Sequence, residues 1–144
     1  MISRNIKRIL ALDFGKKRVG VAISDPLNIT AQPLSTIVYK NDMDLWVNLD
    51  KVQQSFKISH IVLGKPLNMD GSKSDFLKEV ESFGKQLKKR YSVQVDYWDE
   101  RLSSRVAENT LKLSGKSPSR NKSTVDKIAA IWFLQGYMDR LNSN

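Results

Sequence analysis

The amino-acid sequence predicts an α/β domain built on a five-stranded mixed sheet with helices on both faces. Two observations support this prediction. Near the start of the chain, two short apolar runs flank a glycine-containing basic link, a pattern typical of a hairpin of buried strands. Further on, short apolar runs alternate with segments whose apolar residues recur at helical spacing. Hairpin strands followed by alternating helices and strands are typical of an α/β domain with a mixed sheet.

The first strands are expected at residues 9–12 and 19–23. Gly15 supplies the backbone freedom that the tight turn between them needs. A third, short strand is expected at residues 31–38. It contains Pro33, which restricts it to a sheet edge or a strand start.

Apolar spacing and turn residues predict the remaining elements. In chain order they are a helix from Asp42, a buried strand at 60–64, a helix at 72–91 opened by a capping box of Ser72 and Asp75, an alternating strand at 93–98, a helix from Ser103 or Ser104 to near Gly115, a mobile basic loop at 116–122 and a helix at 123–141. Trp46 and Phe56 are assigned to the core rather than to base stacking. The inner stripe of the last helix is predicted to be Val125, Ile128, Ala129, Trp132, Gln135 and Met138.

Length and composition limit the class of protein. The 144 residues are enough for one domain with a real core and hardly enough for two, so we expect a single domain over residues 1–144. No apolar run approaches the roughly 20 residues of a membrane span. No apolar signal-peptide core follows the basic N-terminus. We therefore expect a cytoplasmic protein without a membrane partner.

The ionisable residues point to the chemistry and the partner. The chain has no cysteine and a single histidine, His60, which excludes thiolate sites and a multi-histidine zinc site within one chain. A net charge of +9 favours nucleic acid as the partner, ahead of an anionic membrane. The alternative is that these charges only keep the surface solvated.

Three acids stand at the ends of predicted elements. Asp13 ends the first strand, Asp99 or Glu100 ends the last strand, and Asp126 lies in the first turn of the last helix. Each acid has a structural alternative. Asp13 could cap its turn, Glu100 could pair with Arg101 at the surface, and Asp126 could form a capping box with Ser123.

Taken together, the three acids suggest a metal site. Carboxylates without histidine or cysteine suit hard cations such as Mg²⁺ or Mn²⁺. Two such ions about 4 Å apart can activate water for phosphodiester hydrolysis. The basic surface would attract the polyanionic substrate. Whether the neighbouring Asp99 joins the site is left open by the sequence.

Several blocks of sequence resemble the YqgF/RuvX family of bacterial proteins. In family order and across nearly the whole chain they are LDFG at 12–15 with RVGVAISD at 18–25, GKPLNMDG at 64–71, DERLS at 99–103, and VDKIAA at 125–130 with LQ at 134–135. The family has a ribonuclease H-like fold. Its members are described as candidate nucleases of pre-16S rRNA and as similar to Holliday junction resolvases. Departures from the family pattern are small: Ala11 stands where glycine is common, and Lys65 where an apolar residue is usual.

The resemblance implies a function and a site. The expected activity is metal-dependent hydrolysis of phosphodiester bonds in 5′-end processing of pre-16S rRNA during ribosome biogenesis. The resemblance implies that Asp13, Glu100 and Asp126 are the catalytic and metal-binding residues, with Mg²⁺ or Mn²⁺ as cofactor. It also implies that the loop 64–71 borders them.

Three other functions are weighed against this one. The chain could be a Holliday junction resolvase acting in DNA recombination and repair. It could also be a non-catalytic RNA-binding domain of the same fold. An actin-like or sugar-kinase-like ATPase is suggested by the hairpin around Asp13, but it would need two such domains, and 144 residues leave no room for them.

Polar residues beside the acids are expected to contact phosphates. They are Lys16, Lys17, Arg18, Lys65, Asn68, Arg101, Lys116, Arg120 and Lys122. The expected partner is structured RNA or branched DNA, with pre-ribosomal particles as a wider context. The protein itself is expected to be a monomer or a weak homodimer.

Overall fold

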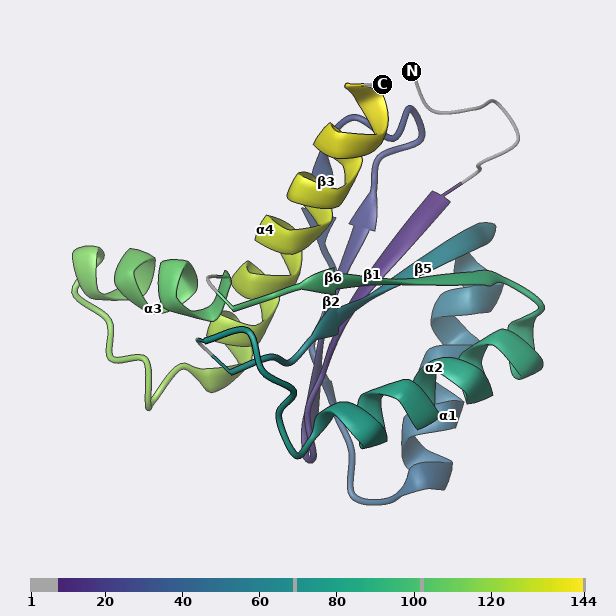
Figure 1. Ribbon diagram of the computed structural model, residues 1–144, viewed down its shortest axis with the longest axis horizontal. Helices are drawn as coiled ribbons and strands as arrows, with labels where there is room; N and C mark the ends of the chain where they lie inside the picture. Colours follow the sequence, from purple (N-terminus) through teal and green to yellow (C-terminus); the bar gives the residue numbers. More distant parts are fainter. Residues whose placement is uncertain (1–7, 69, 102, 144) are drawn as a thin grey trace.

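The computed structural model describes residues 8–68, 70–101 and 103–143, and it contains a mixed sheet with helices on both faces (Figure 1). The strands are β1 (Arg8–Phe14), β2 (Arg18–Ser24), β3 (Ala31–Pro33), β4 (Ile37–Val38), β5 (Ile58–Lys65) and β6 (Gln94–Asp99). The helices are α1 (Asp42–Ser55), α2 (Leu77–Tyr91), α3 (Ser103–Leu113) and α4 (Lys122–Asn142). The predicted α/β fold with a mixed sheet is confirmed.

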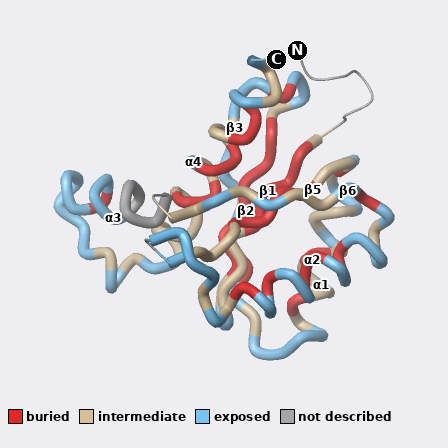
Figure 2. Tube along the Cα trace, in the orientation of Figure 1, coloured by how far each residue is buried: buried red, intermediate tan, exposed pale blue. Residues whose placement is uncertain are grey.

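The sheet has the strand order β3-β2-β1-β5-β6, and β4 also pairs with β2. Strand β1 is antiparallel to β2 and parallel to β5, which is in turn parallel to β6. Helices α1 and α2 cover one face of the sheet and α4 covers the other, with α3 packed beside α4 (Figure 1). The central strands are buried between these layers (Figure 2).

Alternation along β1 divides its side chains between two cores. Leu10 and Leu12 pack in the cluster formed with α1 and α2, whereas Ile9 and Ala11 pack in the cluster formed with α4. Successive strand residues point to opposite faces of a sheet. Asp13 therefore belongs to the α4 face.

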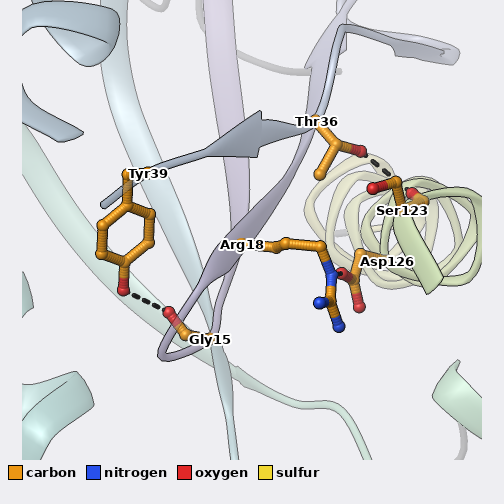
Figure 3. Close-up of polar contacts among 6 residues, drawn as sticks. All are labelled: Gly15, Arg18, Thr36, Tyr39, Ser123 and Asp126. Carbon is orange, nitrogen blue, oxygen red and sulfur yellow. Dashed lines mark hydrogen bonds and ion pairs between the residues drawn. The ribbon is translucent and has the colours of Figure 1, made fainter. Parts of the chain in front are cut away.

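The strand predicted at residues 31–38 is broken into two, so the described part of the chain has six strands in place of the five expected. Strand β3 ends at Pro33, and β4 begins at Ile37; both pair with β2. Between them the Thr36 hydroxyl donates a hydrogen bond to the Ser123 carbonyl of α4, at 2.9 Å (Figure 3). The chain therefore leaves the sheet edge to contact the start of α4 and then returns to it.

Helix α2 begins at Leu77. This is five residues after Ser72, where a capping box of Ser72 and Asp75 was predicted to open the helix. The Ser72 hydroxyl instead donates to the Asp70 carboxylate at 2.6 Å and accepts from the Asn68 amide at 2.9 Å. These bonds hold Ser72 in the loop that follows β5. The expected capping box is therefore wrong, because neighbours within the loop engage this serine.

The start of α4 also differs from the prediction. Its N-cap is Asn121 and its first residue is Lys122, which was expected in the preceding loop. Ser123 is therefore inside the helix, and Asp126 lies beyond the first turn. The structural alternative in which Asp126 forms a capping box with Ser123 is therefore wrong. The predicted mobility of the preceding loop stays a prediction.

The buried face of α4 is displaced from the predicted stripe. Trp132, expected inside, is 53% exposed. The residues that face the sheet are Ala129, Ala130, Phe133, Leu134, Tyr137 and Met138. Helix α4 is apolar on more than one side, so periodicity alone could not select the correct face.

The other core assignments hold. Trp46 and Phe56 pack against the core under α1 and α2, as predicted. Helix α1 is capped by the Asn41 side chain, which accepts from the Asp44 N–H at 2.8 Å. Helix α3 ends close to Gly115, as predicted, whereas the expected cap at Ser103 or Ser104 lies outside the described side chains. Among the described residues, no helix has the length and apolar character needed to cross a membrane.

Candidate functional site

Asp13 lies near the end of β1, with a glycine on the neighbouring strand at each side. Its register partner on β2 is Gly20. The preceding residue of β1, Leu12, pairs with Leu63 of β5, so Gly64 comes next to Asp13 in the parallel register. Strand alternation places Asp13, Gly20 and Gly64 on the α4 face.

Both glycines allow an acidic residue to approach Asp13. A Cβ atom at Gly20 would lie 2.3 Å from the backbone oxygen of Asp126, and one at Gly64 would lie 2.2 Å from Glu100 Oε2. Such distances are too short for any side chain. These glycines were not among the site residues identified from the sequence. The available signal was a glycine inside each strand pattern, which often marks a close approach.

Glu100 and Asp13 form a carboxyl pair. Burial raises the pKa of both groups; the negative charge of Asp13 adds to this effect at Glu100, whose pKa rises much further. Their side chains are hydrogen-bonded to each other. Bringing two carboxyl groups this close favours keeping one proton between them over two negative charges. Glu100 Oε2 is buried without a hydrogen-bond partner.

Asp126 approaches the pair from α4 but directs its carboxylate elsewhere. Its Oδ2 accepts from Arg18 Nε at 2.9 Å (Figure 3). Its negative charge still raises the pKa of both Asp13 and Glu100, so the three acids share one neighbourhood. Within the described part of the chain, no group of three acidic, histidine or cysteine residues is arranged to hold a metal ion. The Asp126 carboxylate is engaged instead in its ion pair with Arg18.

The donor set nevertheless fits a hard cation. All the available ligands are carboxylate oxygens, which Mg²⁺ and Mn²⁺ prefer. One of them, Glu100 Oε2, is buried and unsatisfied, and such an atom is costly unless something binds it. Asp13 and Glu100 could hold a cation in place of their shared proton. Asp126 could join them by exchanging Arg18 for the ion.

Asp99 has a different role from Glu100. Its Oδ2 accepts a hydrogen bond from Arg101 Nε at 2.8 Å and lies 2.7 Å from Arg101 Nη2, and this pairing lowers the pKa of Asp99. The structural alternative in which Glu100 pairs with Arg101 is therefore wrong. Of the two neighbouring acids at the end of β6, Glu100 therefore belongs to the carboxyl pair and Asp99 to a surface ion pair.

A cationic cleft of about 560 Å³ opens beside Asp126, between α3 and the start of α4. Its lining residues are Arg18, Glu108, Lys112, Pro118, Ser119, Lys122, Val125 and Asp126. Three of these are cations, so the cleft can accept a phosphate next to the acids. Lys112 was not identified from the sequence, because its place in α3 gave no reason to expect it here.

The other predicted phosphate contacts lie in two exposed connections and at the end of β5. Lys16 and Lys17 are exposed in the turn between β1 and β2, and Lys116 and Arg120 are exposed in the connection from α3 to α4. Lys65 ends β5, and its carbonyl accepts from the Glu100 N–H at 3.4 Å.

Two predicted contacts are engaged within the protein. The Asn68 amide donates to Ser72 Oγ at 2.9 Å and to the Lys73 carbonyl at 3.3 Å, so it shapes its own loop. The Arg101 guanidinium is bound to Asp99, as described above.

Comparison of the sequence with known families finds one that matches nearly the whole chain. The RuvX sequence profile, described as Holliday junction resolvase, matches residues 7–140. A protein of Caldicellulosiruptor bescii is 43% identical over 141 residues, covering 95% of this chain and 99% of its own. One of Syntrophomonas wolfei is 42% identical over 132 residues, covering 92% and 94%. Both carry the name of candidate pre-16S rRNA nucleases.

Solved structures with the same fold include two resolvases. Thermus thermophilus RuvC, in complex with a Holliday junction substrate, superposes with a TM-score of 0.56 at 13% identity, covering 94% of this chain and 96% of that one. The fowlpox virus resolvase, with Holliday junction DNA, gives 0.55 at 16% identity, covering 93% and 98%. At these identities the likeness establishes the fold, which confirms the ribonuclease H-like prediction.

Proposed function

The chain belongs to the RuvX family, and from this premise we propose that it is a nuclease that hydrolyses phosphodiester bonds of nucleic acid. The observation that carries the proposal is the carboxyl pair of Asp13 and Glu100. Its unsatisfied buried oxygen lies in the same neighbourhood as Asp126. The cationic cleft has Asp126 in its lining, and its lysines can attract a polyanionic substrate.

Each acid would have a defined role. Asp13 and Glu100 would hold a divalent cation between the end of β1 and the segment after β6, and Asp126 would join from α4. When bound, Mg²⁺ or Mn²⁺ would supply an activated water and stabilise charge on the leaving oxygen. Gly20 and Gly64 would keep the space that this assembly needs.

Arg18 would act at the boundary between the acids and the substrate. In the structure its guanidinium neutralises Asp126. After Asp126 joins a cation, the same guanidinium would be released to bind a substrate phosphate, together with Lys112 and Lys122 in the cleft. Planar guanidinium groups suit such contacts because they can donate two parallel hydrogen bonds.

We favour pre-16S rRNA as the substrate, processed at its 5′ end within pre-ribosomal particles in the cytoplasm. The support is the name of the relatives that cover almost the full chain at about 40% identity. Branched DNA is the second candidate, because the fold is shared with resolvases solved with Holliday junctions. Symmetric cleavage of a junction would need a two-fold dimer.

The test compares pre-16S rRNA fragments and four-way junctions in parallel, each with Mg²⁺ and with Mn²⁺. Asp13→Asn and Asp126→Asn keep the shape of each side chain and remove its charge. Cleavage should fall by about two orders of magnitude or more in both variants, because metal activation of water carries much of the rate. Asp139→Asn, a second aspartate of α4, is the matched control and should retain full activity.

The same assay separates the alternatives. Full cleavage by both purified variants would contradict the metal-site proposal. Wild-type protein that binds RNA in EDTA but cleaves neither substrate with either metal would be a binding domain rather than a nuclease. Preference for one substrate decides between RNA processing and junction resolution.

A further inference from the structure

A second cleft, of about 580 Å³, lies on the other side of the β1–β2 hairpin from Asp126. It opens between the start of α1 and the start of α2, on the face of the sheet opposite the acids. Five aromatic residues contribute to its lining: Phe14, Tyr39, Trp46, Phe76 and Phe83. Figure 3 shows Tyr39 on one side of the hairpin, where its hydroxyl donates to the Gly15 carbonyl, and the ion pair of Arg18 with Asp126 on the other.

The Phe14, Phe76 and Phe83 rings in this cleft are nearly parallel, and the Trp46 ring is tilted by 44° to that of Phe83. Phe14 stacks between Phe76 and Phe83, with ring centroids 5.7 and 4.2 Å apart and interplanar angles of 14° and 16°. Trp46 extends the row, at 5.5 Å from Phe83. Phe14, Phe76 and Trp46 are only partly buried, so ring surface faces the cleft. Flat aromatic surface of this kind is what nucleobases stack on in proteins that bind unpaired strands.

Cations accompany the rings. The Lys16 ammonium lies 5.9 Å from the centroid of the Phe76 ring, and the exposed Lys40 and Lys78 also line the cleft. Asp42 and Glu79 lie there too, so the cations exceed the anions by one among the lining residues. A nucleotide matches this combination, because its base would stack on the rings while its phosphate meets a lysine.

The chain connects this cleft directly to the acids. Asp13 and Phe14 are consecutive in β1, and their side chains point to opposite faces of the sheet. Lys16 stands in the exposed turn that joins the two faces. A nucleic-acid strand that contacts the acids and passes over this turn would bring a flanking nucleotide to the rings.

We propose that this aromatic cleft, lined by Phe14, Tyr39, Trp46, Phe76 and Phe83, binds an unpaired nucleobase of the substrate strand, next to the phosphate that Lys16 contacts. The base stacks against Phe76 in place of the Lys16 ammonium. The inference rests on the proposed nuclease function and specifies the substrate further: the strand must carry at least one unpaired base beside the cleaved bond.

The experiment measures binding in EDTA, where no cleavage occurs, by the anisotropy of two labelled single-stranded RNA oligomers. One carries bases, and the other has the same ribose-phosphate backbone without bases. Wild-type protein should favour the base-bearing oligomer by on the order of 5- to 100-fold, the range expected for stacking of one base. Phe76→Leu, which removes the flat ring surface, should bring this ratio close to one.

The matched control is Phe56→Leu. Phe56 is also partly buried against the same core and also lies under a cation, with the Arg8 guanidinium 5.2 Å from its ring centroid, but it does not line the cleft. Its ratio should equal that of the wild type. Lys16→Gln should weaken both oligomers equally, because it removes only the phosphate contact.

A fluorescence measurement tests the same cleft without the Phe76 substitution, so its result does not depend on whether that variant folds. The base-bearing oligomer should quench tryptophan emission of the otherwise intact protein, and Trp46→Phe should abolish this quenching. Equal binding of both oligomers by wild-type protein, or an unchanged ratio in Phe76→Leu, would overturn this inference and leave the proposed nuclease function standing. Either result is expected if the cleft receives a protein segment instead of a base. Wild-type protein that binds neither oligomer would overturn the proposed function as well.

Discussion

At the level of Asp13, the two faces of the sheet carry different kinds of side chain, although the same strands supply both faces. The face under α1 and α2 is a continuous layer of large aliphatic side chains, such as Leu12, Val21 and Leu63. The face under α4, at the same level of the sheet, has Asp13 between Gly20 and Gly64. At this level of the sheet, the first face therefore adds to the buried core, and the second leaves space for charge; the core under α4 lies further along the strands. Consecutive residues of one strand should consequently affect stability and chemistry separately.

The largest effect on stability is expected from Leu63→Ala. Leu63 is fully buried under α2, so truncation should lower the free energy of unfolding by about 2–5 kcal/mol. The folded variant should keep its carboxyl pair, which is on the opposite face. Urea unfolding and Mn²⁺-dependent cleavage of the same sample measure the two quantities. A folded Leu63→Ala protein without activity would show that the faces are not separable.

The neighbouring substitution, Gly64→Ala, should give the reverse result. The added methyl group would meet Glu100 Oε2 at 2.2 Å, which is the movable end of a side chain rather than backbone. The cost in stability should be modest, whereas displacement of Glu100 should reduce cleavage by about tenfold or more, since small misplacements at a reacting centre are costly. Unchanged cleavage with a large loss of stability would contradict this assignment.

A smaller effect concerns pH and the metal-free protein. Burial raises the pKa of Glu100 and Asp13, so above the unfolded pKa of about 4.3 the folded state binds more protons than the unfolded one. Stability should therefore fall as pH rises from that value toward the raised pKa. Glu100→Gln removes this proton and should be more stable than wild type at pH 8, on the order of 1–2 kcal/mol. Melting temperatures in EDTA from pH 5 to pH 8 test it; parallel curves for the two proteins would count against a shared proton.

The smallest effect distinguishes surface cations on the two sides. Lys116 lies in the connection between α3 and α4, whose residues Pro118 and Ser119 line the cleft beside Asp126, and Lys51 lies on α1. Removing one phosphate contact reduces the slope of log affinity against log salt by about 0.9. Lys116→Ala should show this reduction for RNA binding in EDTA, and Lys51→Ala should not. Equal slopes in both variants would place the RNA elsewhere.

Much of the fold was predictable because its strands are strongly patterned. The apolar runs of β1, β2 and β5 and the alternation of β6 located the central sheet. The errors occur where side-chain contacts override local patterns. Ser72 has the spacing of a capping box but bonds to Asp70 and Asn68, and Trp132 matches a helical stripe but faces solvent because α4 docks through Phe133.

The candidate site was predictable only in part. Sequence position and family resemblance identified Asp13, Glu100 and Asp126, and the structure brings them into one neighbourhood. Their pairing was not predictable, because the partner of each acid depends on contacts across the fold. Arg18, expected to face phosphate, neutralises Asp126 across 108 positions of sequence.

Gln135 of α4 has a consequence for association between molecules. Its amide accepts from the Ala31 N–H at 3.0 Å and donates to the Ile29 carbonyl at 2.9 Å, so it occupies backbone groups at the β3 edge of the sheet. Open edges are templates on which strands of other chains can pair and aggregate. The Gln135 amide makes the hydrogen bonds that a neighbouring strand would otherwise make at this edge, and Pro33 has no backbone N–H to donate to such a strand. A single side chain thereby leaves fewer free backbone groups at this edge for a strand of another copy to pair with.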